Sequence, residues 1–251
     1  MNKIILLPVA IFFTILLSAI TVVFAIDDRE QNKPILSEQV DLTGDGKKDL
    51  ITFKGIPLEN ESLFLKEIIM KVKTSEGKSH KIKLEEGYSP TISFHDLNND
   101  GVNDVLVDVQ TGGDDETSHY YLYSFKDARK VNLNVPESLM ISSQYKDEYE
   151  ASIKIIDTNE TFTFDLKNRK DIYDQLGLYI NGKLNEPMEL VVEPFSTLQP
   201  IKLEGDRLGL KGVQKFNGVA NGVPVGVVES KWLLENGKWQ LIETSVRKNN
   251  D

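Results

Sequence analysis

The sequence predicts an all-β protein built from antiparallel hairpins, and three observations lead to this prediction. Short segments in which polar and apolar residues alternate recur along most of the chain, with turn-forming residues between them. A loop rich in Asp, Asn and Gly occurs twice, at a period of about 55 residues, each time directly before an apolar, β-branched run. Near the end of the chain, Asn236-Gly237 is the strongest hairpin turn in the sequence.

Residues 1–25 have the pattern of an export signal. Lys3 supplies a short positive end, the residues after it are almost all apolar, and Val23 and Ala25 are the small residues that a cleavage site requires. The apolar run is also long enough to cross a bilayer uncleaved, so a cleaved signal peptide and a signal anchor both remain open. Either one places the rest of the chain outside the cytoplasm, because the positive end stays inside. Residues 26–34 follow as a polar linker.

Two nine-residue loops carry the clearest chemistry in the sequence. Oxygen-bearing side chains stand at loop positions 1, 3, 5 and 9, a glycine stands at position 6, and position 7 would contribute its backbone carbonyl. The predicted ligands are Asp41, Thr43, Asp45, Asp49 and the carbonyl of Lys47 in the first loop, and Asp96, Asn98, Asp100, Asp104 and the carbonyl of Val102 in the second. Such a set of hard oxygen ligands suits Ca²⁺, which is the cofactor that we predict. The alternative is a pair of solvated turns, which these residue types favour without any ion.

A comparison of the two loops favours metal binding over turn chemistry. Their residues are identical at positions 1, 2, 5, 6 and 9, and they differ at positions 7 and 8, where no ligand side chain is needed. The loops are not EF-hands, because position 12 is Thr52 in one and Val107 in the other, whereas an EF-hand has a bidentate Glu there. A β-branched, apolar run follows each loop instead of a helical pattern.

The pattern Asp-x-x-x-Asp-Gly-x-x-Asp before a strand resembles the FG-GAP/VCBS repeats of extracellular β-propeller proteins. In those repeats a closing carboxylate stands at position 9, as Asp49 and Asp104 do here. The stretch from Asp104 through Thr111-Gly112-Gly113 to Tyr120-Tyr121-Leu122-Tyr123 also resembles secreted VCBS-type proteins of Gram-positive bacteria. The resemblance covers roughly residues 35–135. It implies calcium at the named positions and propeller-blade-like units, but no particular reaction, and two such units are too few to close a ring.

Residues 35–145 therefore form a predicted calcium-loop half. Its expected strands, taken in order, are Leu50–Phe53, His80–Leu84, Thr91–Phe94, Val105–Val109 and Tyr120–Phe125. Between the last two lies the acidic, glycine-rich loop 111–116, for which a hairpin connection and a ligand-facing loop are both open.

Residues 146–251 form a β-rich half without calcium loops. A hairpin is expected around Asp157–Glu160, and Lys170–Leu176 is expected to be a short helix stopped by Gly177. The Asn236-Gly237 turn pairs the residues on either side of it, and the predicted pairs are Glu235 with Lys238, Leu234 with Trp239, and Trp232 with Leu241. The two tryptophans then share one strand face, where we expect them to be core residues rather than a sugar-binding platform.

The composition excludes several functions. The 251-residue chain has a formal net charge of −10, which makes it a poor ligand for nucleic acids and anionic membrane surfaces. It has no cysteine, so disulfides, thiol catalysis and zinc-thiolate sites are excluded. Its three histidines, His80, His95 and His119, are too scattered to indicate a catalytic triad or a transition-metal site. No nucleotide-binding or serine-nucleophile fingerprint is present.

These observations indicate a non-enzymatic, calcium-stabilised β protein that is secreted or held at the cell surface and acts as an interaction or scaffold module. Its partner is an unidentified protein or glycan, and it would contact a membrane only through residues 1–25, if these are not cleaved. An extracytoplasmic hydrolase with catalytic carboxylates in the second half and a structural component of a surface layer or coat are the alternatives. Carboxylates are abundant, but no pair is singled out, so we predict no catalytic residue.

Overall fold

The computed structural model describes residues 34–88, 90–112, 117–219 and 224–249. The predicted signal segment, and all of the linker except Pro34, lie outside these residues, as does most of the acidic loop 111–116. The chain divides into two units, Met1–Pro34 and Ile35–Asp251, and the described strands and helices all belong to the second. Among the residues that the structure describes, no helix combines the length and the apolar character needed to cross a membrane.

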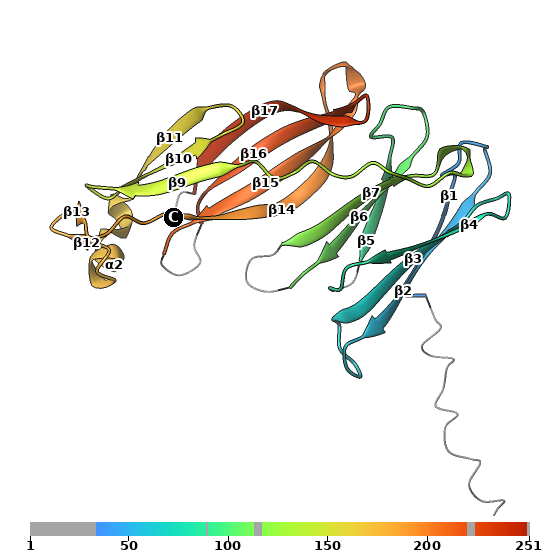
Figure 1. Cartoon of the computed structure of the whole chain (residues 1–251), viewed down its shortest axis with the longest axis horizontal. Coiled ribbons are helices and arrows are strands. Elements are labelled where there is room, and N and C mark those ends of the chain that lie inside the picture. The colour runs from blue at the N-terminus through green and yellow to red at the C-terminus, as the bar shows by residue number, and fades with distance from the viewer. Residues whose placement is uncertain (1–33, 89, 113–116, 220–223, 250–251) are drawn as a thin grey trace, which may run out of the picture. The chain divides into compact units, whose positions relative to one another are not determined.

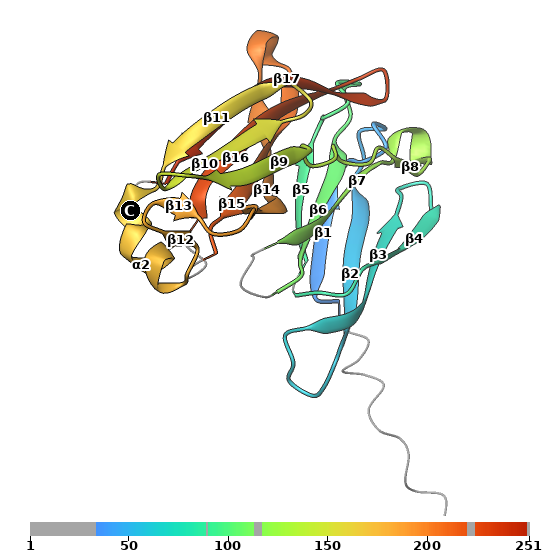
Figure 2. The same ribbon diagram turned by 60° about the vertical axis from the view of Figure 1, so that its left-hand side comes forward.

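The first part of this unit consists of two four-stranded antiparallel sheets, in each of which the strands lie in sequence order (Figures 1 and 2). The first sheet contains β1 (Leu36–Val40), β2 (Asp49–Pro57), β3 (Leu65–Lys73) and β4 (Ser79–Leu84). The second contains β5 (Thr91–His95), β6 (Asp104–Gln110), β7 (Ser118–Ser124) and β8 (Val131–Asn132). In both sheets a predicted calcium loop connects the first strand to the second, so the sequence repeat is also a repeat in topology.

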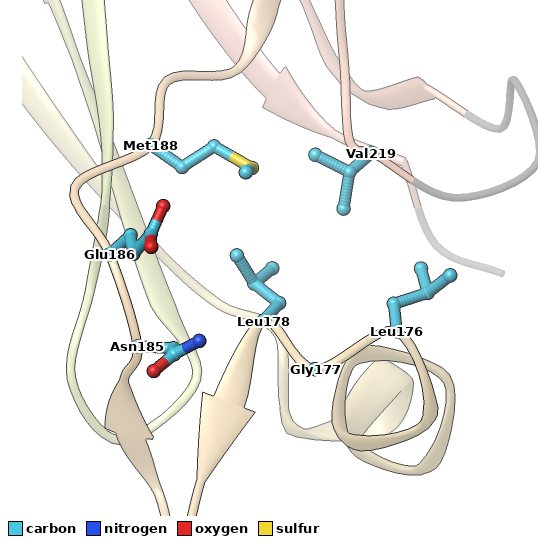
Figure 3. A pocket seen from close by; sticks show the side chains of 7 residues that line it. All are labelled: Leu176, Gly177, Leu178, Asn185, Glu186, Met188 and Val219. Atoms are coloured by element: carbon cyan, nitrogen blue, oxygen red, sulfur yellow. The ribbon is translucent and has the colours of Figure 1, made fainter.

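The second part contains a three-stranded sheet, a long four-stranded sheet and a small pair of strands, all antiparallel. The three-stranded sheet has the order β11-β10-β9 and comprises β9 (Ile141–Lys146), β10 (Glu150–Ile155) and β11 (Glu160–Asp165). The long sheet comprises β14 (Val191–Lys202), β15 (Leu208–Asn217), β16 (Pro224–Glu235) and β17 (Lys238–Lys248). The small pair is β12 (Tyr179–Ile180) with β13 (Lys183–Leu184), close to the short helix α2 (Lys170–Gln175) (Figures 1 and 3). Three 3-10 turns complete the description: η1 (Lys126–Ala128), η2 (Lys167–Arg169) and η3 (Glu204–Asp206).

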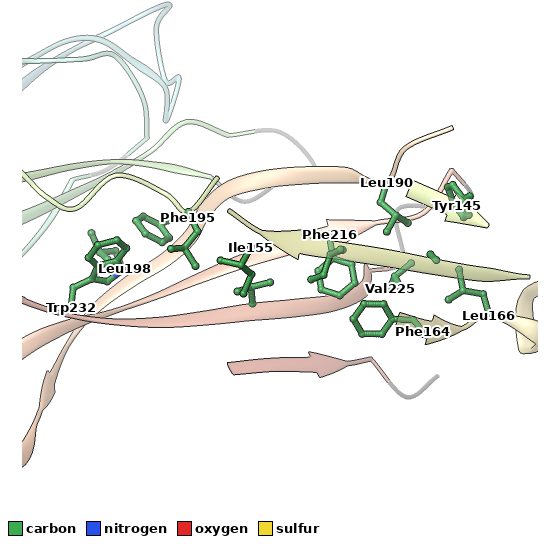
Figure 4. Packing of buried hydrophobic residues seen from close by; sticks show 14 of the residues in the cluster. Tyr145, Ile155, Phe164, Leu166, Leu190, Phe195, Leu198, Phe216, Val225 and Trp232 are labelled. Carbon is green, nitrogen blue, oxygen red and sulfur yellow. The ribbon is translucent and has the colours of Figure 1, made fainter. Parts of the chain in front are cut away.

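Two hydrophobic cores hold these sheets together. One is formed by the first two sheets, and its members include Leu42, Ile51, Phe53, Met70 and Phe125. The other belongs mainly to the second part of the unit, where rings such as Phe164, Phe195, Phe216 and Trp232 pack together (Figure 4).

Strand β6 contributes to both cores. Val105, Val107 and Val109 belong to the first core, whereas Leu106, which lies between them in the sequence, belongs to the second. Successive side chains of a strand point to opposite faces, so this strand is buried on both sides. Burial on both faces explains why its sequence is a continuous apolar run rather than an alternating one.

The structure confirms the all-β class and the antiparallel hairpins, and no sheet among the described residues closes into a barrel. The short helix ends as predicted, with Gly177 at φ +72° and its N–H donating to the carbonyl of Asp174. The turn at Asn236 and Gly237, with φ of 52° and 73°, joins β16 to β17 in the predicted register. Trp232 is buried, and Trp239 packs against the same core. A division after residue 145 would fall within β9, and where the two halves divide stays a prediction.

Candidate metal site and surface pockets

The two candidate loops have equivalent places in their sheets. Position 9 of each loop is the first residue of the second strand and pairs with the last residue of the first strand: Asp49 with Val40, and Asp104 with His95. The position-6 glycines adopt positive φ, +79° at Gly46 and +85° at Gly101, and a Cβ at either would meet no atom within 4 Å. Glycine is therefore needed at these positions because of its positive φ, and not because a side chain would clash.

The same hydrogen bonds hold both loops at positions 1 and 5. The position-1 carboxylate accepts the N–H of the position-6 glycine, and the pairs are Gly46 to Asp41 at 2.8 Å and Gly101 to Asp96 at 2.9 Å. The position-5 carboxylate accepts the N–H of position 7, and the pairs are Lys47 to Asp45 at 2.8 Å and Val102 to Asp100 at 3.0 Å. Hydrogen bonds from backbone N–H groups to the loop's own carboxylates thus hold each loop in its folded conformation.

The position-9 carboxylates fasten the start of each loop to the following strand. Both are buried, and one oxygen of each accepts the N–H groups of positions 2 and 3. The pairs are Leu42 to Asp49 at 2.7 Å, Thr43 to Asp49 at 3.1 Å, Leu97 to Asp104 at 3.0 Å and Asn98 to Asp104 at 3.2 Å. Burial raises the pKa of Asp104 to about 6, and the two N–H donors oppose that rise.

Two oxygen atoms among the predicted ligands are buried without a partner at hydrogen-bond distance among the described residues. They are the hydroxyl of Thr43 and Oδ1 of Asp104. The hydroxyl of Ser124 is nevertheless near enough to Asp104 to oppose the rise in its pKa. The Thr43 hydroxyl likewise lies near enough to Asp45 to help lower the pKa of that carboxyl. Each of the two buried oxygens therefore has one polar side chain nearby.

The residue types of the two loops suit calcium, but their side chains are not arranged around a common point. Within the described part of the chain, no group of three or more His, Cys, Asp or Glu side chains is close enough to hold a metal ion. In the second loop, Asn98 Nδ2 donates to Asp100 Oδ2 at 3.1 Å, which brings positions 3 and 5 together. Carboxylate oxygens that accept one N–H still have a lone pair to offer, and the two buried oxygens have only the side chains of Asp45 and Ser124 beside them. The ten predicted ligands, the carbonyls of Lys47 and Val102 included, stay a prediction.

The two loops lie against each other, which sequence reasoning did not anticipate. A Cβ built on Gly44, at position 4 of the first loop, would lie 2.7 Å from Val102 Cγ2 in the second. The turn η1 contacts both loops: the N–H of Asp127 donates to the Thr43 carbonyl at 3.1 Å, and Lys126 Nζ donates to the Asp100 carbonyl at 2.6 Å. No local motif marks η1 in the sequence, because its role arises only when the two sheets pack.

The histidines do not converge on either loop. His80 Nε2 lies 3.3 Å from the carbonyl of Ala128, His119 is exposed on β7, and His95 stands opposite Asp104 with its pKa lowered by burial. Their places agree with structural roles and bring no nucleophile or metal ligand set together within the described residues.

A pocket of about 260 Å³ opens beside the end of α2 (Figure 3). Its walls are mainly apolar, with Leu176, Met188 and Val219 all exposed to solvent by more than a third, and Glu186 is its one carboxylate. A second pocket, of about 340 Å³, lies along β7 and is lined by Tyr120 and Glu85 among others. Each pocket has one carboxylate, so neither brings together the two that glycoside hydrolysis uses. Sequence reasoning missed both pockets, because their walls come from segments far apart in the chain.

The fold is that of an antiparallel β protein. The comparisons with known proteins then show what its second part is similar to. Residues 139–247 match the family model of the YybI C-terminal domain. Over 210 residues the chain is 29% identical to the "Uncharacterized protein YybI" of Bacillus subtilis (strain 168), an alignment that covers 79% of each protein.

Among solved structures, the chain is similar to two lyases at low TM-score. For the rhamnogalacturonan lyase YesW the TM-score is 0.37, with 14% identity, and the match covers 84% of this chain and 33% of that one. For the exotype rhamnogalacturonan lyase YesX the TM-score is 0.35, with 15% identity over 84% of this chain and 32% of that one. The chain thus spans about a third of either lyase.

These findings correct the resemblance to FG-GAP/VCBS repeats. The matching family model is that of the YybI C-terminal domain and the similar protein is YybI, and neither is an FG-GAP/VCBS repeat family. The physical reason is that the nine-residue pattern is short. Carboxylates that accept N–H groups of a tight connection, with a glycine at positive φ, are what such a connection between two strands needs in any family.

Proposed function

We propose that this is an extracytoplasmic, calcium-binding β protein that acts as an interaction or scaffold module. In this proposal the first two sheets are propeller-blade-like units, and each binds one calcium ion in the loop between its first two strands. The observation that carries the proposal is the matched hydrogen-bond scheme of the two loops. The role of the ion is structural.

Electrostatics supports this role. Each loop holds three carboxylates within nine residues, so without a cation like charges stand close together. Bound calcium would supply the positive charge that relieves this repulsion. The residues that would hold it are Asp41, Thr43, Asp45, Lys47 and Asp49 in the first loop, and Asp96, Asn98, Asp100, Val102 and Asp104 in the second. An ion that binds only the folded state at a hundredfold excess over Kd would stabilise it by about 2.7 kcal/mol.

The proposed location outside the cytoplasm rests on residues 1–25 and suits weak oxygen-only sites. Calcium sites of extracellular modules have Kd values of roughly 10⁻⁴ to 10⁻³ M. The chain would be secreted if the segment is cleaved and held at the membrane if it is not.

The apolar pocket beside α2 supports an interaction role over catalysis. Exposed Leu176, Met188 and Val219 around one hollow provide a contact surface of the kind that binding proteins use (Figure 3). The partner would be a protein or a glycan outside the cell. No described pair of carboxylates favours the hydrolase alternative.

The proposal is tested by calorimetry and thermal unfolding of the protein without residues 1–25. Calcium should bind with a stoichiometry of two per chain, and the melting temperature should be higher in millimolar calcium than in chelator. Magnesium at the same concentration should have a smaller effect, because it demands near-ideal octahedral geometry. No heat on calcium addition together with an unchanged melting temperature would refute the calcium sites. Capture of extracellular partners with and without chelator then tests the interaction role.

A further inference from the structure

Strand β7 has an edge that is only partly paired, and a pocket borders the open part. Its outer neighbour β8 is two residues long and pairs with Tyr123 and Ser124. We infer that the rest of this edge, residues 118–121, is a docking site for an extended peptide with a basic residue, which adds to the sheet as a further strand. The inference goes beyond the proposed function, because it assigns a second site and a class of partner, and it does not depend on calcium.

The pairing of β7 determines which of its backbone groups face the open edge. The N–H of Leu133, which follows β8, donates to the carbonyl of Leu122 at 3.0 Å, so the backbone groups of Leu122 point away from β6. β7 pairs with β6 without a register shift, and the direction of these groups alternates along an antiparallel strand. The N–H and C=O groups of Ser118 and Tyr120 therefore point to the open edge. Within the described residues, none of them has a backbone partner.

The pocket of about 340 Å³ lies along this edge. Its lining includes all of residues 118–121, which are consecutive in β7. Successive side chains of a strand point to opposite faces, so a pocket lined by a continuous run of residues borders the edge of the strand and not one of its faces. Such a run spans about 10 Å from first to last residue. The pocket therefore has room beside the strand where the unpaired backbone groups point.

Two tyrosine hydroxyls hold the walls of the pocket in place. The Tyr120 hydroxyl accepts the N–H of Leu198 at 3.2 Å and donates to the carbonyl of Ser196 at 3.5 Å, both in β14. The Tyr121 hydroxyl accepts the N–H of Glu85, which follows β4, at 2.9 Å. The segments on either side are thus tied to β7 itself, so the pocket is formed before any peptide binds.

Charge and hydrogen-bonding pattern select the occupant. Glu85 is the one carboxylate that lines the pocket, it is exposed, and it forms no ion pair within the described part of the chain. A Lys or Arg side chain of the added strand would supply the opposite charge. The open edge offers N–H donors and C=O acceptors at every second residue, which is the pattern that another extended backbone complements. An extended basic peptide fits both features, whereas a glycan matches neither.

Selection from a displayed library of random twelve-residue peptides tests the inference. The bait is the chain without residues 1–25, which lie outside the compact unit Ile35–Asp251. The selected peptides should share a basic residue within an extended, proline-free core, because proline cannot donate to a strand ladder. Calorimetry with the synthetic consensus peptide then measures the affinity at an ionic strength of about 0.15 M, where distant charges are largely screened.

Glu85→Lys should weaken binding of the consensus peptide at least tenfold, because it reverses the charge of the pocket. Its matched control is Glu86→Lys, at an exposed neighbour that does not line the pocket, which should change the affinity less than twofold. Both substitutions leave the backbone N–H that the Tyr121 hydroxyl accepts, and circular dichroism of each variant checks that the fold is retained.

Two further measurements test the strand pairing itself. Only alternate residues of an added strand hydrogen-bond to their neighbour, so N-methylation of the peptide amides, one at a time, should weaken binding at every second position. Hydrogen exchange followed by NMR should show the amides of Ser118 and Tyr120 protected at least tenfold by the peptide. The amide of His119 faces β6 and should not change.

Several outcomes would overturn the inference. They are the selection of no peptide, equal binding to wild type and to Glu85→Lys, an N-methylation profile without alternation, and an unprotected Tyr120 amide in the complex. Binding of a glycan in this pocket in place of any peptide would overturn it as well. None of these results bears on the calcium titration, so the inference and the proposed function fail separately.

Discussion

The N–H of Ser75 donates to Oδ1 of Asp49 at 2.7 Å across the first sheet. In the second loop, Oδ1 of Asp104 accepts no backbone N–H from the described residues. Ser75 lies in the turn between β3 and β4, and its hydroxyl also donates to Asp45 at 2.6 Å. The first loop is thus fastened to the opposite hairpin through the carboxylates of Asp49 and Asp45, whereas the second is fastened to the equivalent connection through the Asp100 carbonyl, which accepts from Lys126. The two loops should respond differently to the loss of their position-9 carboxylate.

Asp49→Ala should destabilise the protein strongly whether or not calcium is present. The substitution removes the acceptor of three N–H groups, those of Leu42, Thr43 and Ser75, at a buried position. We expect a loss of about 2–4 kcal/mol in the free energy of unfolding, since unsatisfied buried donors each cost about 1–3 kcal/mol. Urea unfolding in chelator measures it. A loss below 1 kcal/mol in chelator would contradict this account of Asp49.

Asp104→Asn should depend on calcium. In chelator the substitution removes a carboxylate whose burial is unfavourable, so stability should stay the same or rise by about 1 kcal/mol. In millimolar calcium it should lower stability relative to wild type, because a ligand charge is lost. Thermal unfolding under both conditions gives the difference, and Asp171→Asn on the exposed side of α2 is the control. Equal changes in calcium and in chelator would show that Asp104 has no part in binding an ion.

Asp108→Asn should change the pH dependence of stability. Burial raises the pKa of Asp108, and a hydrogen bond with Ser118 opposes that rise. A carboxyl whose pKa is raised by folding adds stability below its unfolded pKa of about 3.9, and this stability is lost as pH rises through the folded value. The asparagine variant should therefore be more stable than wild type at pH 7, by on the order of 1 kcal/mol, with the advantage vanishing towards pH 3. Urea unfolding between pH 3 and 8 measures this. If the stability advantage of Asp108→Asn over wild type grew on acidification, the raised pKa of Asp108 would be contradicted.

Gly44→Ala and Gly101→Ala should separate backbone strain from the contact between the loops. Both glycines have positive φ, but only at Gly44 would a Cβ meet the Val102 side chain. Gly101→Ala should cost about 1–2 kcal/mol from backbone conformation alone, and Gly44→Ala should cost about 1–3 kcal/mol more from overpacking.

Adding Val102→Ala should recover most of that excess in the Gly44 variant and none of the loss in the Gly101 variant. A double-mutant cycle by urea unfolding measures the coupling. Additive effects of Gly44→Ala and Val102→Ala would show that the loops do not press on each other in solution.

Features set by neighbouring residues could be predicted from the sequence. The Asn236-Gly237 turn determines the pairing of β16 with β17, because a two-residue turn that needs positive φ at both positions leaves only one register. The equivalence of the two candidate loops could be predicted for the same reason, since the hydrogen bonds that they share lie within nine residues.

Features set by packing could not be predicted. Lys126 and Asp100 are 26 residues apart, and their contact depends on how β7 leads into η1. The apolar pocket joins Leu176 to Val219, which no periodicity relates. The resemblance to FG-GAP/VCBS repeats failed because the spacing of acids in a tight connection reports local geometry and not ancestry.

The double burial of β6 also determines how this strand can change in evolution. Its odd-numbered valines supply one core and Leu106 the other, so adding or deleting one residue would exchange the occupants of both cores at once. Substitutions of similar size can be absorbed singly at these positions, whereas a change of length cannot. Among homologous chains, insertions and deletions should therefore gather in the connecting loops and leave the length of this strand invariant.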